Sequence, residues 1–313
     1  MRNRISIPLL NKLTLFIILV GFFDKFWPFF LLSQFRLFYL AISTVWLIIL
    51  TYMRKPIEIA VAVTGICLNL YAMDVFTLYA PLATQPTAQV KFKLLEMNVQ
   101  YNNMSHEKAA ALIKETNADI VVIEELTPLW AKSLSDCMKA YPHRVLSPQD
   151  STYGNGVYSK YPIQQSKIGL FCPRNHPTIK VDLDIENNFV SLIHTHLQGP
   201  VSPRYFAYHY DDAQGVSEML KESFADAILC GDMNSSSWCN PLKSLIKNAH
   251  MVDSRQGRGL QLSWPTKARP PYFPILAIDH CFARGNLAVV DRKLGPYFGS
   301  DHFPVITSFA FTR

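Results

Sequence analysis

The chain has 313 residues, of which 49% are hydrophobic and 17% are charged, and its formal net charge is +6. With a mean hydropathy of +0.09, this composition excludes a disordered chain, a collagen-like repeat and a small disulfide scaffold. Residues 1–90 contain seven basic and three acidic side chains, so four of the six net charges lie there. The rest of the chain is nearly neutral, which does not favour a strongly basic nucleic-acid-binding domain.

Three apolar runs, at about 13–32, 37–53 and 57–80, dominate the N-terminal part. A membrane-spanning helix needs about 20 mostly apolar residues, so residues 1–80 are predicted to form a membrane anchor with two or three transmembrane helices. The first run is interrupted by Asp24, Lys25 and Pro28. Buried helices of a soluble protein are one alternative. A cleaved signal peptide over residues 1–23 is another, but no small-residue cleavage site follows.

Basic residues near the apolar runs bear on orientation. With three spans and a cytoplasmic N-terminus, five basic residues lie inside and four outside, which slightly favours a C-terminal domain facing away from the cytoplasm. We therefore expect a multi-pass cell-membrane protein with an extracytoplasmic catalytic domain. The lipid bilayer is its expected partner, and no obligate protein partner is inferred. Residues 81–90 read as a linker rich in Pro, Thr and Gln.

From residue 91 onward, short apolar strands alternate with polar turns and a few amphipathic helices. Strands are predicted at 92–99, 120–123, 157–158, 189–197, 227–230, 275–282 and 305–311, and helices at 106–116, 211–223 and 240–248. Many strands with few helices between them favour an α/β sandwich over a strictly alternating barrel. Five of the six cysteines lie in this part; five cannot all pair, so a complete disulfide framework is not indicated.

Polar side chains gather at the ends of these strands. An Asp or Asn after a strand is by itself an ordinary turn residue, but the same feature at six strands indicates a site. The set consists of Asn98, Glu125, His196, Asp232, Asn234, Asp279, Asp301 and His302.

These residue types suit the hydrolysis of phosphate esters. Carboxylate and amide oxygens are the donors that Mg²⁺ prefers, and the bound ion neutralises phosphate oxygens. A His held by a carboxylate can donate to the phosphoryl group. The sequence lacks HExxH, paired CxxC, GxxxxGK[ST] and GxSxG motifs, which argues against a zinc protease, a zinc ribbon, a P-loop NTPase and a serine hydrolase.

The order of these motifs resembles the endonuclease/exonuclease/phosphatase superfamily over residues 91–313. The resemblance rests on Met97–Gln100, Ile123–Leu126, Gly154–Ser159, Thr195–Leu197, Gly231–Asn234, Ile278–His280 and Gly299–Pro304. The apolar N-terminus, the linker and the Ser263–Pro265 segment are similar to a membrane-anchored bacterial branch. The resemblance implies a four-layer α/β sandwich, in which two packed β-sheets are flanked by helices.

The resemblance also implies a role for each residue. Glu125 is the main ligand of Mg²⁺, with Mn²⁺ as the alternative ion, and Asn98 and Asp301 lie beside it. Asp232 orients or deprotonates the attacking water, and Asn234 and His196 hold the phosphate. Asp279 orients His302, which stabilises the transition state or acts as the acid.

The sequence departs from many apurinic-type nucleases of the family at Gln100, where they have Asp; this weakens the case for a second metal and for abasic-site repair. Structural roles are expected for Glu124, His194 and His280.

The substrate stays open between nucleic acid and a phospholipid or inositol phosphate, and a catalytically inactive binding module is a further alternative. Aromatic and basic residues in two predicted loops, 204–210 and 267–273, can stack bases, enter a lipid headgroup region, or simply pack the rim of the domain.

Overall fold

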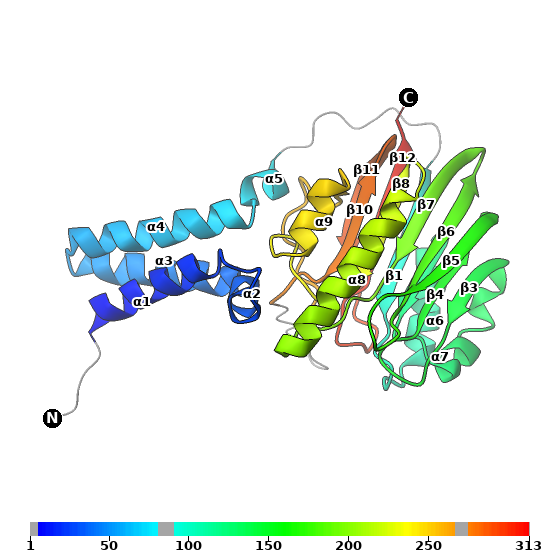
Figure 1. Cartoon of the computed structure of the whole chain (residues 1–313), viewed down its shortest axis with the longest axis horizontal. Coiled ribbons are helices and arrows are strands. Elements are labelled where there is room, and N and C mark those ends of the chain that lie inside the picture. Colours follow the sequence, from blue (N-terminus) through cyan, green and yellow to red (C-terminus); the bar gives the residue numbers. More distant parts are fainter. Residues whose placement is uncertain (1–5, 81–90, 267–274, 313) are drawn as a thin grey trace.

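The computed structural model describes residues 6–80, 91–266 and 275–312. Its two parts are a helical region, formed by residues 6–80, and a larger α/β part, formed by the rest (Figure 1). The predicted linker 81–90 and the predicted loop 267–273 lie outside the described residues.

The first β-sheet has six strands in the order β11-β12-β1-β2-β4-β3. Its central strand β1 runs parallel to β2 and antiparallel to β12. The strands are β1 (Lys91–Asn98), β2 (Ile120–Glu124), β3 (His143–Ser147), β4 (Asn155–Ser159), β11 (Leu287–Leu294) and β12 (Val305–Phe311).

The second β-sheet also has six strands, in the order β5-β6-β7-β8-β10-β9. Here β7 runs parallel to β8, and β10 runs antiparallel to β8. The strands are β5 (Ile163–Leu170), β6 (Pro177–Ile185), β7 (Asn188–His194), β8 (Ala227–Asp232), β9 (Val252–Asp253) and β10 (Asp279–Arg284).

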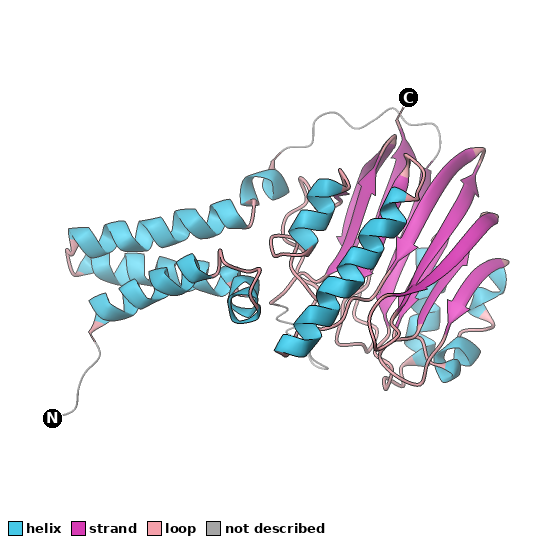
Figure 2. Cartoon of the chain, viewed as in Figure 1, coloured by secondary structure: helices cyan, strands magenta, loops and turns pink. Residues whose placement is uncertain are grey.

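The two sheets pack face to face and helices cover both outer faces, so the predicted sandwich is confirmed (Figure 2). An apolar core that includes Leu94 and Leu192 fills the space between the sheets. The first sheet packs on α6 (His106–Thr116) and α7 (Pro128–Ser133), and a short 3-10 turn follows at Cys137–Ala140. The second sheet packs on α8 (Pro203–Lys221) and α9 (Leu242–Asn248).

Along the central strands, the side chains between the sheets change from apolar to polar toward one edge. In β1, Leu94 lies in the core, and because side chains alternate with a period of two, Glu96 and Asn98 share its face. β8 repeats the order, with Ile228 in the core and Asp232 at the edge. The edge that collects these polar ends is therefore set by strand direction.

The helical region consists of α1 (Ile7–Val20), α2 (Trp27–Gln34), α3 (Arg36–Tyr52), α4 (Pro56–Ala72) and α5 (Val75–Tyr79). Helices α1, α3 and α4 lie side by side and extend away from the sheets (Figure 1). In the described part of the chain, no single helix has both the length and the apolar character to cross a membrane. Only α2 and α3 taken together, with a bend of 63° between them, meet that standard.

Several predicted boundaries were wrong. The first apolar run splits into α1 and α2, because the chain turns between Gly21 and Phe26. Residues 204–210 are not a loop but the first two turns of α8, which starts where the Ser202 hydroxyl caps the amide of Tyr205 at 3.2 Å. Strands β3, β5, β6, β9 and β11 were missed. All six cysteines are free.

The helical region packs directly on the α/β part through α2. The indole N–H of Trp27 donates to the carbonyl of Pro200 at 3.0 Å, and the amide of Ser236 donates to Gln34 Oε1 at 2.9 Å. The rings of Phe30 and Phe206 lie 4.9 Å apart. The loops that follow β7 and β8 are therefore held against α2.

A buried ion pair fixes the segment beyond β9. The Arg255 guanidinium is fully buried and donates to Asp253 Oδ2 at 2.7 Å. Burial acts to raise the pKa of Asp253, but the charge and hydrogen bonds of Arg255 overcome it and hold this pKa well below its usual value. Breaking a buried pair by removing one charge leaves the other uncompensated, which costs about 3–5 kcal/mol.

We predict that Asp253→Asn lowers the Tm of the full chain by on the order of 10 °C, as measured by thermal unfolding in detergent. Because the folded-state pKa of Asp253 is depressed, its stabilising contribution is complete above the unfolded pKa near ~4 and is lost as the pH falls further. The Tm difference between the two proteins should thus be constant from about pH 5 to 8 and shrink in more acidic solution.

The control is Asp136→Asn, which removes a solvent-exposed carboxylate paired with Lys139 and should leave the Tm unchanged. Equal Tm values for Asp253→Asn and the wild type at neutral pH would contradict the prediction.

Candidate phosphoesterase site

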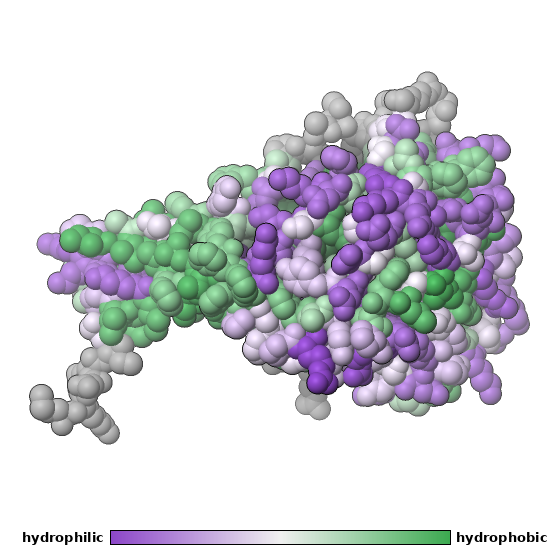
Figure 3. All heavy atoms as spheres, viewed as in Figure 1, coloured by the Kyte–Doolittle hydropathy of each residue, from purple (hydrophilic) through white to green (hydrophobic). Residues whose placement is uncertain are grey.

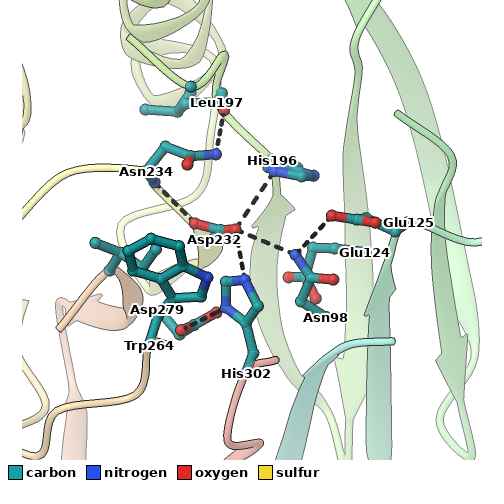
Figure 4. Close-up of polar contacts among 12 residues, drawn as sticks. Asn98, Glu124, Glu125, His196, Leu197, Asp232, Asn234, Trp264, Asp279 and His302 are labelled. Atoms are coloured by element: carbon teal, nitrogen blue, oxygen red, sulfur yellow. Dashed lines mark hydrogen bonds and ion pairs between the residues drawn. The ribbon is translucent and has the colours of Figure 1, made fainter. Parts of the chain in front are cut away.

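Three polar side chains meet at the carboxylate of Asp232, at the end of β8 (Figure 4). The amide of Asn98 donates to Asp232 Oδ2 at 3.1 Å and to Glu125 Oε1 at 3.3 Å. His196 Nε2 and His302 Nε2 lie 3.4 Å and 3.7 Å from the same Asp232 oxygen. Residues from both sheets thus converge on one carboxylate.

The turns after the strands aim these side chains. Glu125 and Asn234 have φ values of 57° and 46°, in the left-handed region that non-glycine residues seldom adopt. Tyr101 N donates to Glu125 Oε2 at 2.8 Å, and Asn234 N donates to Asp232 Oδ1 at 2.8 Å. Hydrogen bonds from backbone amides to the carboxylates of Glu125 and Asp232 therefore help to hold these two turns in place.

His302 and Asp279 form the second pair of the site. His302 Nδ1 lies 3.0 Å from both carboxylate oxygens of Asp279, so Nε2 points toward Asp232. The backbone of Asp279 is itself fixed, because its amide donates to Ser263 Oγ at 3.3 Å and its carbonyl accepts from Arg292 at 3.1 Å. Asp279 thus sets the orientation of the His302 ring.

Asp301 lies at the rim. Its side chain is 36% exposed, and Asp301 Oδ1 is 3.9 Å from His302 Nε2. The indole N–H of Trp264 donates to Asp301 Oδ2 at 3.2 Å, and the Trp264 and His302 rings lie 6.4 Å apart. Trp264 was not predicted as a site residue, although the Ser263–Pro265 segment had been singled out.

The pKa values of the two histidines are shifted in opposite directions. Burial lowers the pKa of His196 to about 4, so this ring is neutral near pH 7. Burial acts in the same direction on His302, but the charges of Asp279 and Asp232 raise the pKa of His302 to about 10. For Asp232 itself, burial raises the pKa to about 7, partly offset by His302.

A second layer of polar residues lies behind the site. Neither carboxylate oxygen of Glu96 or Glu124 has a hydrogen-bond partner in the described part of the chain. Burial, reinforced by nearby carboxylates, raises both pKa values well above the usual range. His194 Nδ1 lies 3.5 Å from Glu124 Oε1, whereas His280 Nε2 donates to the carbonyl of Ser235 at 2.9 Å.

The donor set fits a hard divalent cation. The Glu125 carboxylate, the Asn98 amide and the Asp301 carboxylate offer oxygen atoms, which Mg²⁺ and Mn²⁺ prefer. Asp232, Asp279 and His302 lie close enough together to hold an ion, but the His302 ring is already directed at both oxygens of Asp279. We therefore keep Asn98, Glu125 and Asp301 as the predicted ligands.

All eight predicted residues lie at one edge of the sandwich. Asn98, His196, Asn234 and His302 each contact Asp232. Glu125 contacts Asn98, and Asp279 and Asp301 contact His302.

Several solved structures share this fold. An endonuclease/exonuclease/phosphatase family protein from Bacteroides thetaiotaomicron is 16% identical, with a TM-score of 0.60, covering 72% of this chain and 97% of that one. TDP2 from D. rerio, complexed with a single-strand DNA product, is 15% identical, with a TM-score of 0.58, covering 71% and 99%. A protein from Beutenbergia cavernae is 19% identical, with a TM-score of 0.56, covering 72% of each chain.

The sequence itself gives the family. None of the curated proteins matches the chain. The model of the Endonuclease/Exonuclease/phosphatase family, whose members hydrolyse phosphoester bonds with a divalent metal, matches residues 95–302. This range begins within β1 and ends at His302, so it includes all eight predicted site residues and leaves out β12. The chain belongs to the endonuclease/exonuclease/phosphatase family.

Proposed function

We propose that the protein is a membrane-anchored phosphodiesterase that depends on Mg²⁺, with Mn²⁺ as the alternative ion. The observation that carries the proposal is the convergence on Asp232 Oδ2, which lies within 3.7 Å of Asn98, His196 and His302. Three nitrogen groups around one carboxylate, beside a set of oxygen donors, suit the hydrolysis of a phosphodiester by water.

Each side chain has a part in this reaction. Asp232 orients the attacking water and accepts its proton, since its carboxylate is fixed by Asn98 and by the amide of Asn234. His196 and Asn234 hold the phosphate oxygens. A divalent cation held by Glu125, Asn98 and Asp301 supplies charge neutralisation at the phosphate. His302, which Asp279 orients, donates to the phosphoryl or leaving-group oxygen.

The first substrate class that we propose is nucleic acid. Support comes from the shared fold with D. rerio TDP2, whose structure holds a single-strand DNA product. Tyr205 and Arg174 add local support, because the Arg174 guanidinium donates to the Tyr205 hydroxyl at 3.0 Å and lies 5.3 Å from its ring. Exposed aromatic and basic groups of this kind can stack on bases and pair with phosphates.

Phospholipid is the second candidate, and contacts of α2 favour it. The loop after His196 meets α2 at Pro200, and the loop after Asn234 meets it at Ser236. If the helical region is embedded in a bilayer, the phosphoesterase site lies one loop away from the helices that touch lipid.

The positions of the apolar and polar side chains in the helical region support the proposal that it is a membrane anchor. Most of the face of this region seen in Figure 3 is apolar, apart from its far end, and Phe16, Ile42 and Ile57 are 60%, 39% and 74% exposed. Polar side chains point inward instead: Asn69 is fully buried and donates to the carbonyl of Gly65 at 2.9 Å. Apolar outer faces with small and polar residues between helices are typical of helix packing in membranes.

Helix length is consistent with a thin or locally adjusted bilayer. The 17 residues of α3 and of α4 span about 25 Å at about 1.5 Å per residue, compared with a hydrocarbon core of about 30 Å. Local thinning of the bilayer accommodates a modest shortfall. The extracytoplasmic placement of the catalytic domain remains a prediction from the basic residues.

We predict that the purified full chain hydrolyses a generic phosphodiester, that EDTA stops the reaction and that Mg²⁺ or Mn²⁺ restores it. Asp232→Ala and His302→Ala should each lower the rate by at least about 100-fold. A panel of single- and double-stranded DNA, RNA, phospholipid vesicles and inositol phosphates then identifies the substrate class. If the wild type is no faster than both variants on every substrate, the protein is a binding module and the proposal is wrong.

We predict that Asp279→Asn lowers kcat by about 100-fold or more with little change in KM, because the His302 ring loses the carboxylate that orients it. The matched control is Asp184→Asn. Asp184 accepts from the amide of Asn187 at 2.8 Å, where the chain turns from β6 to β7. This turn lies at the end of the second sheet opposite to the site, so the substitution should leave kcat unchanged. Equal kcat values for the two variants, with equal Tm values, would contradict the role given to Asp279.

We predict that the wild-type chain stays in the membrane fraction after an alkaline carbonate wash. Ile42→Lys, on the outer face of α3, should reduce this fraction, since a Lys near the bilayer centre costs about 2.5–3.5 kcal/mol. Ile168→Lys is the control, because Ile168 is similarly exposed (44%, against 39% for Ile42) but lies on β5. Release of the wild type by carbonate would rule out the membrane anchor.

A further inference from the structure

A second cluster of metal-binding residue types lies outside the phosphoesterase site. Cys172 and His176 belong to the turn before β6, and Asp212 belongs to α8. One ligand atom from each lies within 4.8 Å of the other two. His176 Nδ1 is 3.2 Å from Asp212 Oδ2, and the three residues are only 4%, 2% and 2% exposed.

The imidazole of His176 is buried, and Nδ1 approaches Asp212 Oδ2 without the geometry of a hydrogen bond. Neither ring nitrogen has a hydrogen-bond partner in the described part of the chain, and Asp212 Oδ1 has none either. Asp212 Oδ2 accepts from the amide of Gln198 at 3.0 Å, and the Tyr153 ring stacks on His176 at 3.8 Å. Buried polar atoms are nearly always paired, so these atoms call for a ligand.

The turn around Cys172 places backbone amides near the sulfur. The amide of Asn175 donates to the carbonyl of Cys172 at 3.0 Å, which closes a tight turn around the sulfur. Burial, the Asp212 charge and a hydrogen bond to the Asp212 side chain raise the pKa of the Cys172 thiol to about 11, while the backbone amides of Arg174 and His176 hydrogen-bond the sulfur and act in the opposite direction. Backbone amides directed at sulfur stabilise a thiolate, which is the form that binds a metal.

We propose that Cys172, His176 and Asp212 bind one zinc ion. A thiolate, an imidazole and a carboxylate form a mixed S, N and O set that suits Zn²⁺, whereas Mg²⁺ and Ca²⁺ bind oxygen donors only. Coordination replaces the S–H bond of Cys172 with a Zn–S bond, and the thiol proton passes to water. Three protein ligands leave one tetrahedral position for a water molecule.

The zinc would join the turn before β6 to α8 beside the phosphoesterase site. Burial is the main cause that lowers the pKa of His196, and the nearby His176 lowers it further, whereas the charge of Glu125 raises it. Asp212 is hydrogen-bonded to Gln198, two residues beyond His196. The zinc site shares no residue with the predicted Mg²⁺ site, and this inference does not depend on the proposed function.

The test uses Co²⁺ as a spectroscopic substitute for zinc in the purified full chain. We expect one equivalent of Co²⁺ to produce a thiolate-to-cobalt charge-transfer band in the near ultraviolet, and one equivalent of Zn²⁺ to abolish it. Cys172→Ser, His176→Ala and Asp212→Asn should each lose the band. Cys137→Ser, which changes another buried free cysteine, and Glu125→Gln, which changes the other site, should both keep it.

The absorption-edge fine structure of zinc in the wild-type protein gives a second answer that needs no variant. We expect one sulfur neighbour near ~2.3 Å and the rest nitrogen or oxygen near ~2.0–2.1 Å. A wild type without a thiolate band, a zinc shell with no sulfur or with two or more, or a band that survives in folded Cys172→Ser would each overturn the proposal.

Discussion

Each β-sheet carries only part of the site, so its chemistry depends on how the two sheets pack face to face. The first sheet and its loops supply Asn98, Glu125 and His302, and the second supplies His196, Asp232 and Asp279. Two hydrogen-bonded pairs cross between them, Asn98 to Asp232 and His302 to Asp279. The β8–β10 register places Asp232 directly opposite Asp279, so both pairs are held by one ladder. A shift of one residue, about 3.3 Å, would separate them.

The layer behind the site limits the charge at this edge. Glu96 and Glu124 lie between the apolar core and the site, and burial raises their pKa values well above the usual range. Raised pKa values favour the uncharged form of both carboxyl groups, which reduces the cost of burying them behind the site.

The sequence predicted the site better than the fold around it. Its residues follow apolar strands whose direction brings their ends together, so Asn98, Asp232 and the rest were visible as polar ends. Strand β5 was missed because it is an exposed edge strand whose residues, such as Gln164 and Lys167, show no alternation of burial. Residues 204–210 were assigned to a loop although Ser202 and Pro203 form a standard helix start. The Cys172 cluster was invisible because Asp212 lies in a helix distant along the chain, and only the fold brings it to His176.

The helical region and the α/β part are linked through the loops that carry the site, since α2 contacts Pro200 and Ser236.

The central claim is that Asn98, Glu125 and Asp301 hold the catalytic cation while His302 and Asp279 act as a hydrogen-bonded pair. The most direct test is an anomalous difference map from a crystal of the protein soaked in Mn²⁺. The account predicts one peak within bonding distance of Glu125 and Asn98, with the His302–Asp279 hydrogen bond intact. A peak between Asp279 and His302, or no peak at this edge, would contradict it.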